Sequence, residues 1–436
     1  MKKLIALSLV LILALGMLPA LAYEDGAHLV FTFWGSPIEK EVINAAMKDF
    51  EEAHPGVTVE SVHVPNEYDT KMQTMAAAGE APDTCYMSIP MAFAWAKEGE
   101  LVNVYDRLAD DPVFSKDDFV DGTWYEWEEG KAFGSIPAIE PFGVFYNKDM
   151  FDAAGVEYPS ADWTWDDFIA IAKKLTVDAS GKHPDEEGFN AENIVQYGAQ
   201  ISTGATGYIS FVWSNGGDYF NEDHTKFALT EPAATEAIQK IADAVNVEHV
   251  APSPIQAKAI PSPVIALQSN MVAMYVGGQW NCLDLGDSDM NFDLVPLPQM
   301  GDVKASVMQG GTVVTNANSK YPDAAWELWK WMYSPDSVLN VHARGLWMPV
   351  QKAWLEEEEL LDKWALNNKY HPSGFKATFI DSTLEYGRPF MNMYMPNFDE
   401  IEAIVAPALD NVWLGETTAA EALASVEADV NAILAK

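Results

Sequence analysis

Three tryptophans stand where an aromatic ring could face a ligand rather than a hydrophobic core. Trp34, Trp280 and Trp347 each lie close to glycine or proline, at the end of an expected strand or in a loop. Aromatic faces stack on the apolar C–H face of a sugar, while acids, amides and arginine bond its hydroxyls. Core tryptophans are expected within periodic apolar faces, as Trp165 and Trp326 are. The pattern indicates rings that could line a ligand cleft, with core packing as the alternative for each ring.

Motifs for a reaction centre do not occur. The sequence has no GxxxxGK(S/T) phosphate loop, no HExxH zinc motif and no GxSxG nucleophile, and its eight histidines are scattered singly. Segment 287–293 resembles the start of a calcium loop but lacks the glycine at the sixth position and the glutamate at the twelfth. We therefore expect a non-enzymatic protein with no metal and no cofactor. The alternative is a secreted carbohydrate-active enzyme, although no carboxylate pair is singled out.

The charge balance excludes several partners. The chain of 436 residues has 26 basic and 65 acidic residues, a formal net charge of −39. Such a field repels a phosphate backbone and an anionic membrane surface, so we expect no nucleic-acid partner. Hydrophobic residues make up 49%, which is ample for a folded core. The length predicts two or three compact units.

The amino terminus has the features of a secretory signal peptide. Lys2 and Lys3 precede an apolar run from Leu4 to Leu18, and a small-x-small cleavage site ends at Ala22. The run is shorter than a membrane span, and no later stretch is long and apolar enough to be one. No lipobox cysteine follows the run. We expect a cleaved, soluble, exported protein, periplasmic or extracellular.

The two cysteines do not form a disulfide framework. Cys85 and Cys282 are far apart in sequence, and a framework needs more cysteines than these. Two buried thiols are expected, with a single bridge as the alternative.

Strand and helix patterns alternate from the start of the mature chain. Strands at 28–34, 57–64 and 83–87 are separated by helices that begin after Ser36 and at Glu67. Ser36 and Glu39 match a capping box, as do Thr418 and Glu421 before the last helix. The alternation predicts parallel strands joined by helices, hence an α/β fold. Segments rich in Gly or Pro at 134–143, 251–263 and 296–311 are candidate crossings or linkers.

Short motifs occur in order along nearly the whole chain after residue 22. They are Phe33-Trp34-Gly35, Gly79 to Asp83, 137–149, 163–168, 271–280, Gly310-Gly311, 324–335, 345–349 and Gly387-Arg388-Pro389. Their order and spacing resemble the extracellular solute-binding proteins, family 1, of bacterial ABC importers, the sugar-binding family that includes the maltose-binding protein. Two departures are the missing lipobox cysteine and the apolar Ala153.

This resemblance implies a two-lobe periplasmic-binding-protein fold, type II-like, with a ligand cleft between lobes that the chain crosses several times. Such lobes close by hinge motion around a ligand. We assign 23–139 plus 297–350 to the first lobe and 140–296 plus 351–436 to the second, with crossings near 140, 296 and 350.

The resemblance also implies cleft residues. Asp83 and Glu140 fall where the family has cleft carboxylates, with a structural cap or hinge bond as the alternative. Trp213 and Asp218 lie in a family-like loop, while Arg388 and Tyr394 lie in a late cleft segment. The full set of expected ligand-binding residues is Trp34, Asp83, Glu140, Trp213, Asp218, Trp280, Gly311, Trp347, Arg388 and Tyr394.

These expectations combine into one functional hypothesis. The protein is expected to be a monomeric receptor that binds a sugar or oligosaccharide and delivers it to ABC permease subunits. A same-fold receptor for glycerol-3-phosphate or another small solute is the nearest alternative. The low content of basic residues disfavours an anionic ligand.

Overall fold

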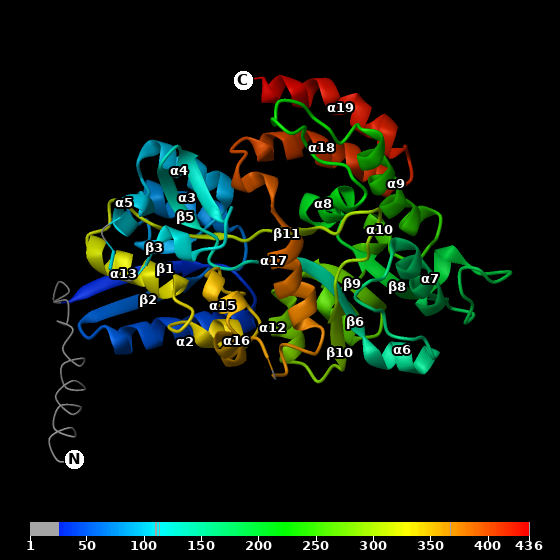
Figure 1. The fold of residues 1–436 in the computed structure, drawn as a ribbon, viewed down its shortest axis with the longest axis horizontal. Coiled ribbons are helices and arrows are strands. Elements are labelled where there is room, and N and C mark those ends of the chain that lie inside the picture. Colours follow the sequence, from blue (N-terminus) through cyan, green and yellow to red (C-terminus); the bar gives the residue numbers. More distant parts are fainter. Residues whose placement is uncertain (1–25, 110, 113, 367, 436) are drawn as a thin grey trace, which may run out of the picture.

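The computed structural model describes residues 26–109, 111–112, 114–366 and 368–435. The predicted signal peptide, residues 1–22, lies outside these described residues. Two lobes, each built around a β-sheet, lie side by side (Figure 1). No helix in the described part of the chain is long and apolar enough to cross a membrane.

The first lobe is built on a four-stranded sheet in the order β12-β3-β1-β2. Strands β1, β2 and β3 are parallel, as predicted, and β12 joins β3 in antiparallel register from far along the chain. Their bounds are β1 Ala27–Phe33, β2 Val57–His63, β3 Thr84–Met87 and β12 Thr312–Thr315. The longer helices of this lobe are α2 Pro37–Ala53, α3 Tyr68–Ala77, α4 Ile89–Glu98 and α13 Pro322–Tyr333.

The second lobe has a five-stranded sheet in the order β10-β6-β9-β8-β7. Its strands are β6 Phe142–Asn147, β7 Val177–Asp178, β8 Ile194–Ile201, β9 Val272–Gly278 and β10 Phe292–Val295. Strand β8 is parallel to β9, whereas β6 is antiparallel to both β9 and β10. The longer helices are α7 Trp165–Leu175, α8 Ala205–Ser214, α9 Pro232–Asn246, α18 Phe398–Trp413 and α19 Ala419–Leu434.

Shorter elements connect and flank the two sheets. A hairpin is formed by β4 (Trp124–Glu128) and β5 (Lys131–Ser135), and β11 (Ser306–Met308) pairs in parallel with β13 (Gly387–Pro389). The short helices are α5 Val104–Ala109, α6 Lys148–Ala154, α10 Pro254–Ala257, α11 Pro263–Gln268, α12 Asn281–Gly286, α14 Leu339–Ala343, α15 Lys352–Glu356, α16 Glu358–Trp364 and α17 Ser382–Tyr386. A π-helical turn spans Lys376–Asp381.

Helix starts follow the local capping signals. The hydroxyl of Ser36 accepts a hydrogen bond from the Glu39 N–H at 3.1 Å, which begins α2. Thr418 and Glu421 form the complete capping box predicted for the last helix. These caps satisfy backbone donors that have no partner inside the helix. They therefore set helix boundaries that the sequence alone predicts.

The chain passes between lobes through segments that lie next to each other. The first passage follows β5 and the second joins β10 to β12, in the stretches predicted at 134–143 and 296–311. The Ile139 N–H donates to the carbonyl of Met348 at 3.2 Å, and the Glu140 N–H donates to that of Gln309 at 2.9 Å. The predicted linker 251–263 instead stays between α9 and β9 of the second lobe.

The lobe boundary near 350 differs from our assignment. The 345–350 segment does run beside the first crossing, but α16 then packs against α14, which contacts α2 of the first lobe. The π-helical turn at 376–381 is the next element to reach the second sheet, at β6 and β10. We therefore propose that residues 352–364 belong with the first lobe.

Two hydrophobic clusters pack around the two sheets, and the first cluster extends into the second lobe through Phe145, Phe292 and Leu294. One cluster gathers Leu29, Phe31 and Trp329 around the first sheet, and another gathers Val144, Met274 and Trp413 around the second. Both cysteines are buried free thiols, which confirms that expectation.

Packing of α7 on the second sheet generates a stability prediction. A Cβ at Gly198 in β8 would lie 1.9 Å from the carbonyl oxygen of Ala172 in α7. Gly198→Ala should therefore lower the free energy of unfolding by about 3 kcal/mol, because the backbone must move. Urea unfolding measures this loss. Gly204→Ala is the control: its Cβ meets no atom within 4 Å, and an equal loss there would contradict the explanation.

Candidate functional site

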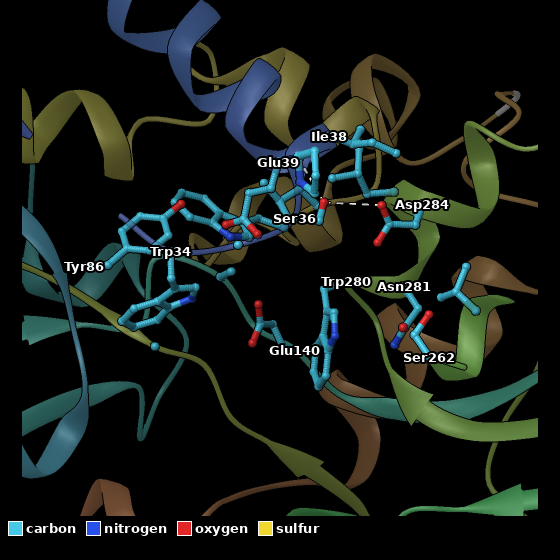
Figure 2. A pocket seen from close by; sticks show the side chains of 18 of the residues that line it. Trp34, Ser36, Ile38, Glu39, Tyr86, Glu140, Ser262, Trp280, Asn281 and Asp284 are labelled. Atoms are coloured by element: carbon cyan, nitrogen blue, oxygen red, sulfur yellow. Dashed lines mark hydrogen bonds between the residues drawn. The ribbon is translucent and has the colours of Figure 1, made fainter. Parts of the chain in front are cut away.

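A cavity of about 750 Å³ lies between the two lobes. Strand ends converge on it: β1 and β3 end there, β12 begins there, and across the gap β9 ends and β6 begins. Figure 2 shows Trp34 and Tyr86 on one side, Trp280 and Asn281 on the other, and Glu140 between them. Its size suits a small-molecule ligand, and open α/β sheets place ligand sites at the carboxyl ends of their strands.

Trp34 is held by its aromatic neighbours on the first lobe. Its ring meets Tyr68 and Tyr86 edge-on, with both centroid distances 5.0 Å. Trp347 packs on the other side of Tyr86 at 5.7 Å. A Cβ at Gly311 would lie 3.0 Å from the Trp34 ring, so glycine leaves the space that the indole occupies. These contacts give the wall a defined shape before any ligand arrives.

Trp280 is positioned from the second lobe. It directly precedes α12, and its ring lies across the backbone of Gly278, where a Cβ would come within 1.8 Å of the indole. Phe142 of β6 meets the ring edge-on at 5.7 Å. Glycine before this tryptophan is thus a steric requirement for the ring to line the cavity.

Glu39 places a carboxyl group in the cavity from the first turn of α2. Gly35 makes this possible: its φ of +114° favours glycine, and a Cβ there would lie 1.9 Å from Oε2 of Glu39. Burial raises the pKa of Glu39 to about 8, and the negative charge of Asp284 contributes in the same direction. The sequence explained Glu39 as a capping residue, which is why it was not predicted as a site residue.

Glu140 adds a second acid from the first crossing. Burial raises its pKa to about 8, and the charge of Glu39 adds to the shift. Burial and then the charges of Glu39 and Glu140 also raise the pKa of the Tyr86 hydroxyl well above its usual value. The two carboxyl groups therefore act on the same small region of the cavity.

Asp284 brings a third acid from α12. Its carboxylate accepts a hydrogen bond of 3.3 Å from the hydroxyl of Ser36, the residue that caps α2 (dashed in Figure 2). Burial raises the pKa of Asp284, and the charge of Asp287 adds to this. The bond links α12 to the start of α2. Asp284 stands one helical turn after Trp280, and that spacing is the signal that could have identified it.

The acids of the cavity have no positive partner among the described residues that line it. Among the described residues that line the cavity there is no lysine, arginine or histidine. Arg344 and Lys369 form ion pairs with Asp287, at 2.6 Å and 3.2 Å, rather than with the lining acids. Within the described chain, no group of three or more His, Cys, Asp or Glu residues could hold a metal ion.

Five of the ten predicted site residues line this cavity. They are Trp34, Glu140, Trp280, Gly311 and Trp347. The structure adds Glu39, Tyr86 and Asp284, which sequence reasoning missed. Tyr86 was not identified because it lies inside a buried strand, where an aromatic residue is expected to serve the core.

Asp83 does not line the cavity, contrary to the prediction. It stands at the amino end of β3, whereas the cavity lies at the carboxyl end. Its carboxylate accepts hydrogen bonds from the Val30 N–H at 2.8 Å and the Ser319 hydroxyl at 2.6 Å. These contacts match the alternative given for Asp83 in the sequence analysis, a structural cap.

The other four predicted residues lie outside the cavity lining. The Trp213 indole and the Arg388 guanidinium both donate to the carboxylate of Asp218, and Arg388 lies 4.3 Å from the Trp213 ring centroid. Tyr394 stacks on His224 with 40% of its surface exposed. Trp213, Asp218 and Arg388 thus satisfy one another and join β13 to α8.

Two lobes built on separate sheets, with a ring-lined cavity between them, define a two-lobe ligand-binding protein. The chain belongs to the bacterial extracellular solute-binding protein family, whose model matches residues 45–368.

Known proteins share this fold across nearly their whole length. An ABC substrate-binding protein from Listeria monocytogenes, solved in complex with cycloalternan, superposes with a TM-score of 0.79 at 24% identity, covering 94% of this chain and 100% of that one. A solute-binding protein from Thermotoga lettingae, bound with α-D-tagatose, gives 0.75 at 22% identity, covering 94% and 100%. A protein of Sinorhizobium fredii named as a probable amino-acid ABC transporter periplasmic-binding protein is 24% identical, covering 89% of this chain and 88% of its own length.

The buried acids generate a pH-dependent prediction for stability. Glu140 has an ordinary pKa of 4.5 and about 8 in the fold, so between these values the folded state holds more protons than the unfolded state. Stability conferred at this site therefore falls as pH rises from about 4.5 to about 8. Glu140→Gln should raise the unfolding free energy near pH 8, relative to the native chain, on the order of 4 kcal/mol, with little difference near pH 4.5.

Urea unfolding at both pH values measures this difference. Glu41→Gln, an exposed glutamate of α2, is the control and should leave stability unchanged at either pH. A Glu140→Gln effect that is the same at both pH values would show that the substitution acts through packing.

Proposed function

We propose that this chain is an exported, monomeric substrate-binding protein that binds a sugar or oligosaccharide in the interlobe cavity and delivers it to an ABC permease. The observation that carries the proposal is the cavity, in which Trp34, Trp280 and Trp347 surround acids that can bond hydroxyls. Membership of the solute-binding family supports the receptor role. The ligands named for the solved neighbours, cycloalternan and tagatose, support the sugar class.

Binding and delivery follow from the position of the cavity between lobes. A ligand that touches Trp34 on one side and Trp280 on the other contacts both lobes at once. It therefore stabilises the closed arrangement over an open one, and the closed form is what a permease would recognise. The crossing segments near Glu140 supply the hinge.

The anionic alternatives lack support in the cavity. Glycerol-3-phosphate and the carboxylate of an amino acid both need a positive partner, and none of the described lining residues supplies one. The amino-acid ligand implied by the name of the Sinorhizobium relative is therefore not the ligand that we propose for this cavity.

An enzymatic role is also disfavoured by the acids themselves. Hydrolysis of a glycoside uses one protonated and one ionised carboxyl group. Here burial raises the pKa of Glu39 and Glu140 alike, to about 8, so their surroundings do not separate an acid from a base.

A thermal-shift screen over mono- and oligosaccharides tests the sugar-binding role. At least one sugar should raise the melting temperature and change tryptophan fluorescence. Trp280→Ala should weaken the binding of that sugar by about 30-fold, because a stacked central ring contributes about 2 kcal/mol to the binding free energy. Trp127→Ala, a half-buried ring on β4 outside the cavity, should bind normally. Normal binding by Trp280→Ala would refute the site.

The receptor role and the enzyme role are separated by product analysis. Incubating the purified protein with the oligosaccharides of the screen should give no cleavage products by chromatography. Any turnover that Glu140→Gln abolishes would overturn the receptor interpretation.

A further inference from the structure

The charge of the cavity carries information about its ligand. Three carboxyl groups, from Glu39, Glu140 and Asp284, enter it from separate elements. Burying even one ionised carboxylate costs several kcal/mol unless a positive group or several donors compensate for it. The described lining has no lysine, arginine or histidine, and the nearby Arg344 is paired with Asp287. A neutral polyol supplies no positive partner for these carboxyl groups, whereas a positive ligand group would compensate for their ionised forms.

Aromatic rings surround the same region. Trp34 and Tyr86 form one wall, and Trp280 faces them across the cavity (Figure 2). Trp347 also lines the cavity and packs against Tyr86. The face of an indole or phenol ring attracts a cation, and the attraction is strongest where water is excluded. Rings together with unpaired acids therefore favour a positive ligand group more than either feature alone.

A metal ion does not fit this arrangement. Within the described residues no three His, Cys, Asp or Glu side chains come together as metal ligands, so the acids line a cavity without forming a coordination shell. A cation spread over an organic group suits acids that stand apart and rings that contact its carbon atoms.

We propose that the cavity takes an amino-substituted sugar whose ammonium group binds against Glu39 and Glu140 while its ring stacks on Trp280. This inference rests on the proposed function and narrows its ligand class. The ammonium donates charge-assisted hydrogen bonds to the two carboxylates, which are stronger than bonds from neutral hydroxyls. Asp284, held by the Ser36 hydroxyl, adds negative potential from the opposite lobe.

Binding should release protons. The groups that face Glu39 are the Tyr86 hydroxyl, Ser36 and Asp284, and those that face Glu140 include Glu39 and Tyr125. With burial raising the pKa of both glutamates to about 8, they are largely protonated at neutral pH. An ammonium ligand favours their ionised forms, so each carboxyl that pairs with it gives its proton to the buffer.

Isothermal titration with matched sugar pairs tests the inference. The pairs are glucosamine and glucose, galactosamine and galactose, and chitobiose and cellobiose, which differ only in ammonium against hydroxyl. At least one amino sugar should bind about tenfold more tightly than its neutral partner near pH 7. Titration in two buffers of different ionisation enthalpy should show proton release for the amino sugar alone.

Substitutions separate charge recognition from a structural effect. Glu39→Gln and Glu140→Gln should each remove the proton release and the preference for the amino sugar, so that the amino sugar and its neutral partner bind with similar affinity. Glu41→Gln, on the exposed side of α2, should retain the preference.

The outcomes also distinguish this inference from the proposed function. If no amino sugar binds more tightly than its neutral partner, the inference is overturned. A neutral sugar that binds in the thermal-shift screen then still supports the receptor role. If neither neutral nor amino sugars bind in either experiment, both proposals fail.

Discussion

The close approach of the segments that cross between lobes is the constraint on which the site depends. The first crossing bonds through its backbone to Gln309 of the second crossing and to Met348. Contact this close requires glycine: a Cβ at Gly310 would lie 2.4 Å from the carbonyl oxygen of Ala138, and one at Gly143 would lie 2.3 Å from Thr378. The same pairing aims Glu140 into the gap between the two sheets. The pairing of the crossing segments and the position of Glu140 in the cavity therefore arise from one set of backbone contacts.

The cavity also shows how binding competes with stability. Ionising the carboxyl groups of Glu39 and Glu140 would cost less free energy in water. Gly35 and the crossing segments nevertheless hold these groups in the cavity, where desolvation raises their pKa values. Sites that keep unpaired polar groups in place are stabilised by the rest of the fold. Here two large cores supply that stability, and the ligand supplies the missing partners.

Much of the fold could be predicted because its signals are local. Apolar periodicity predicted the strands of the first sheet, and capping residues predicted the starts of α2, α7 and α19. Glycine and proline content predicted the first two crossings. The tryptophans beside glycine or proline, Trp34, Trp280 and Trp347, line the cavity, and their role in ligand binding stays a prediction. Asp83 was misplaced because the resemblance gives a position along the chain, and only β-sheet geometry tells which end of a strand faces the cavity. The family resemblance also predicted four further cleft residues, whose ring and charge contacts lie outside the cavity lining. These residues are Trp213, Asp218, Arg388 and Tyr394.

The sequence by itself determined the alternation of strands and helices, the family resemblance and the aromatic character of the site, because each of these is written in neighbouring residues. The tertiary structure decided which acids meet. Glu39 looked like a helix cap, and Asp284 was not singled out at all, until α2 and α12 were brought together at the cavity. Charge in a cavity depends on distances between residues that are remote in sequence. The net charge of the chain could not reveal that three acids share a cavity whose described lining has no cation.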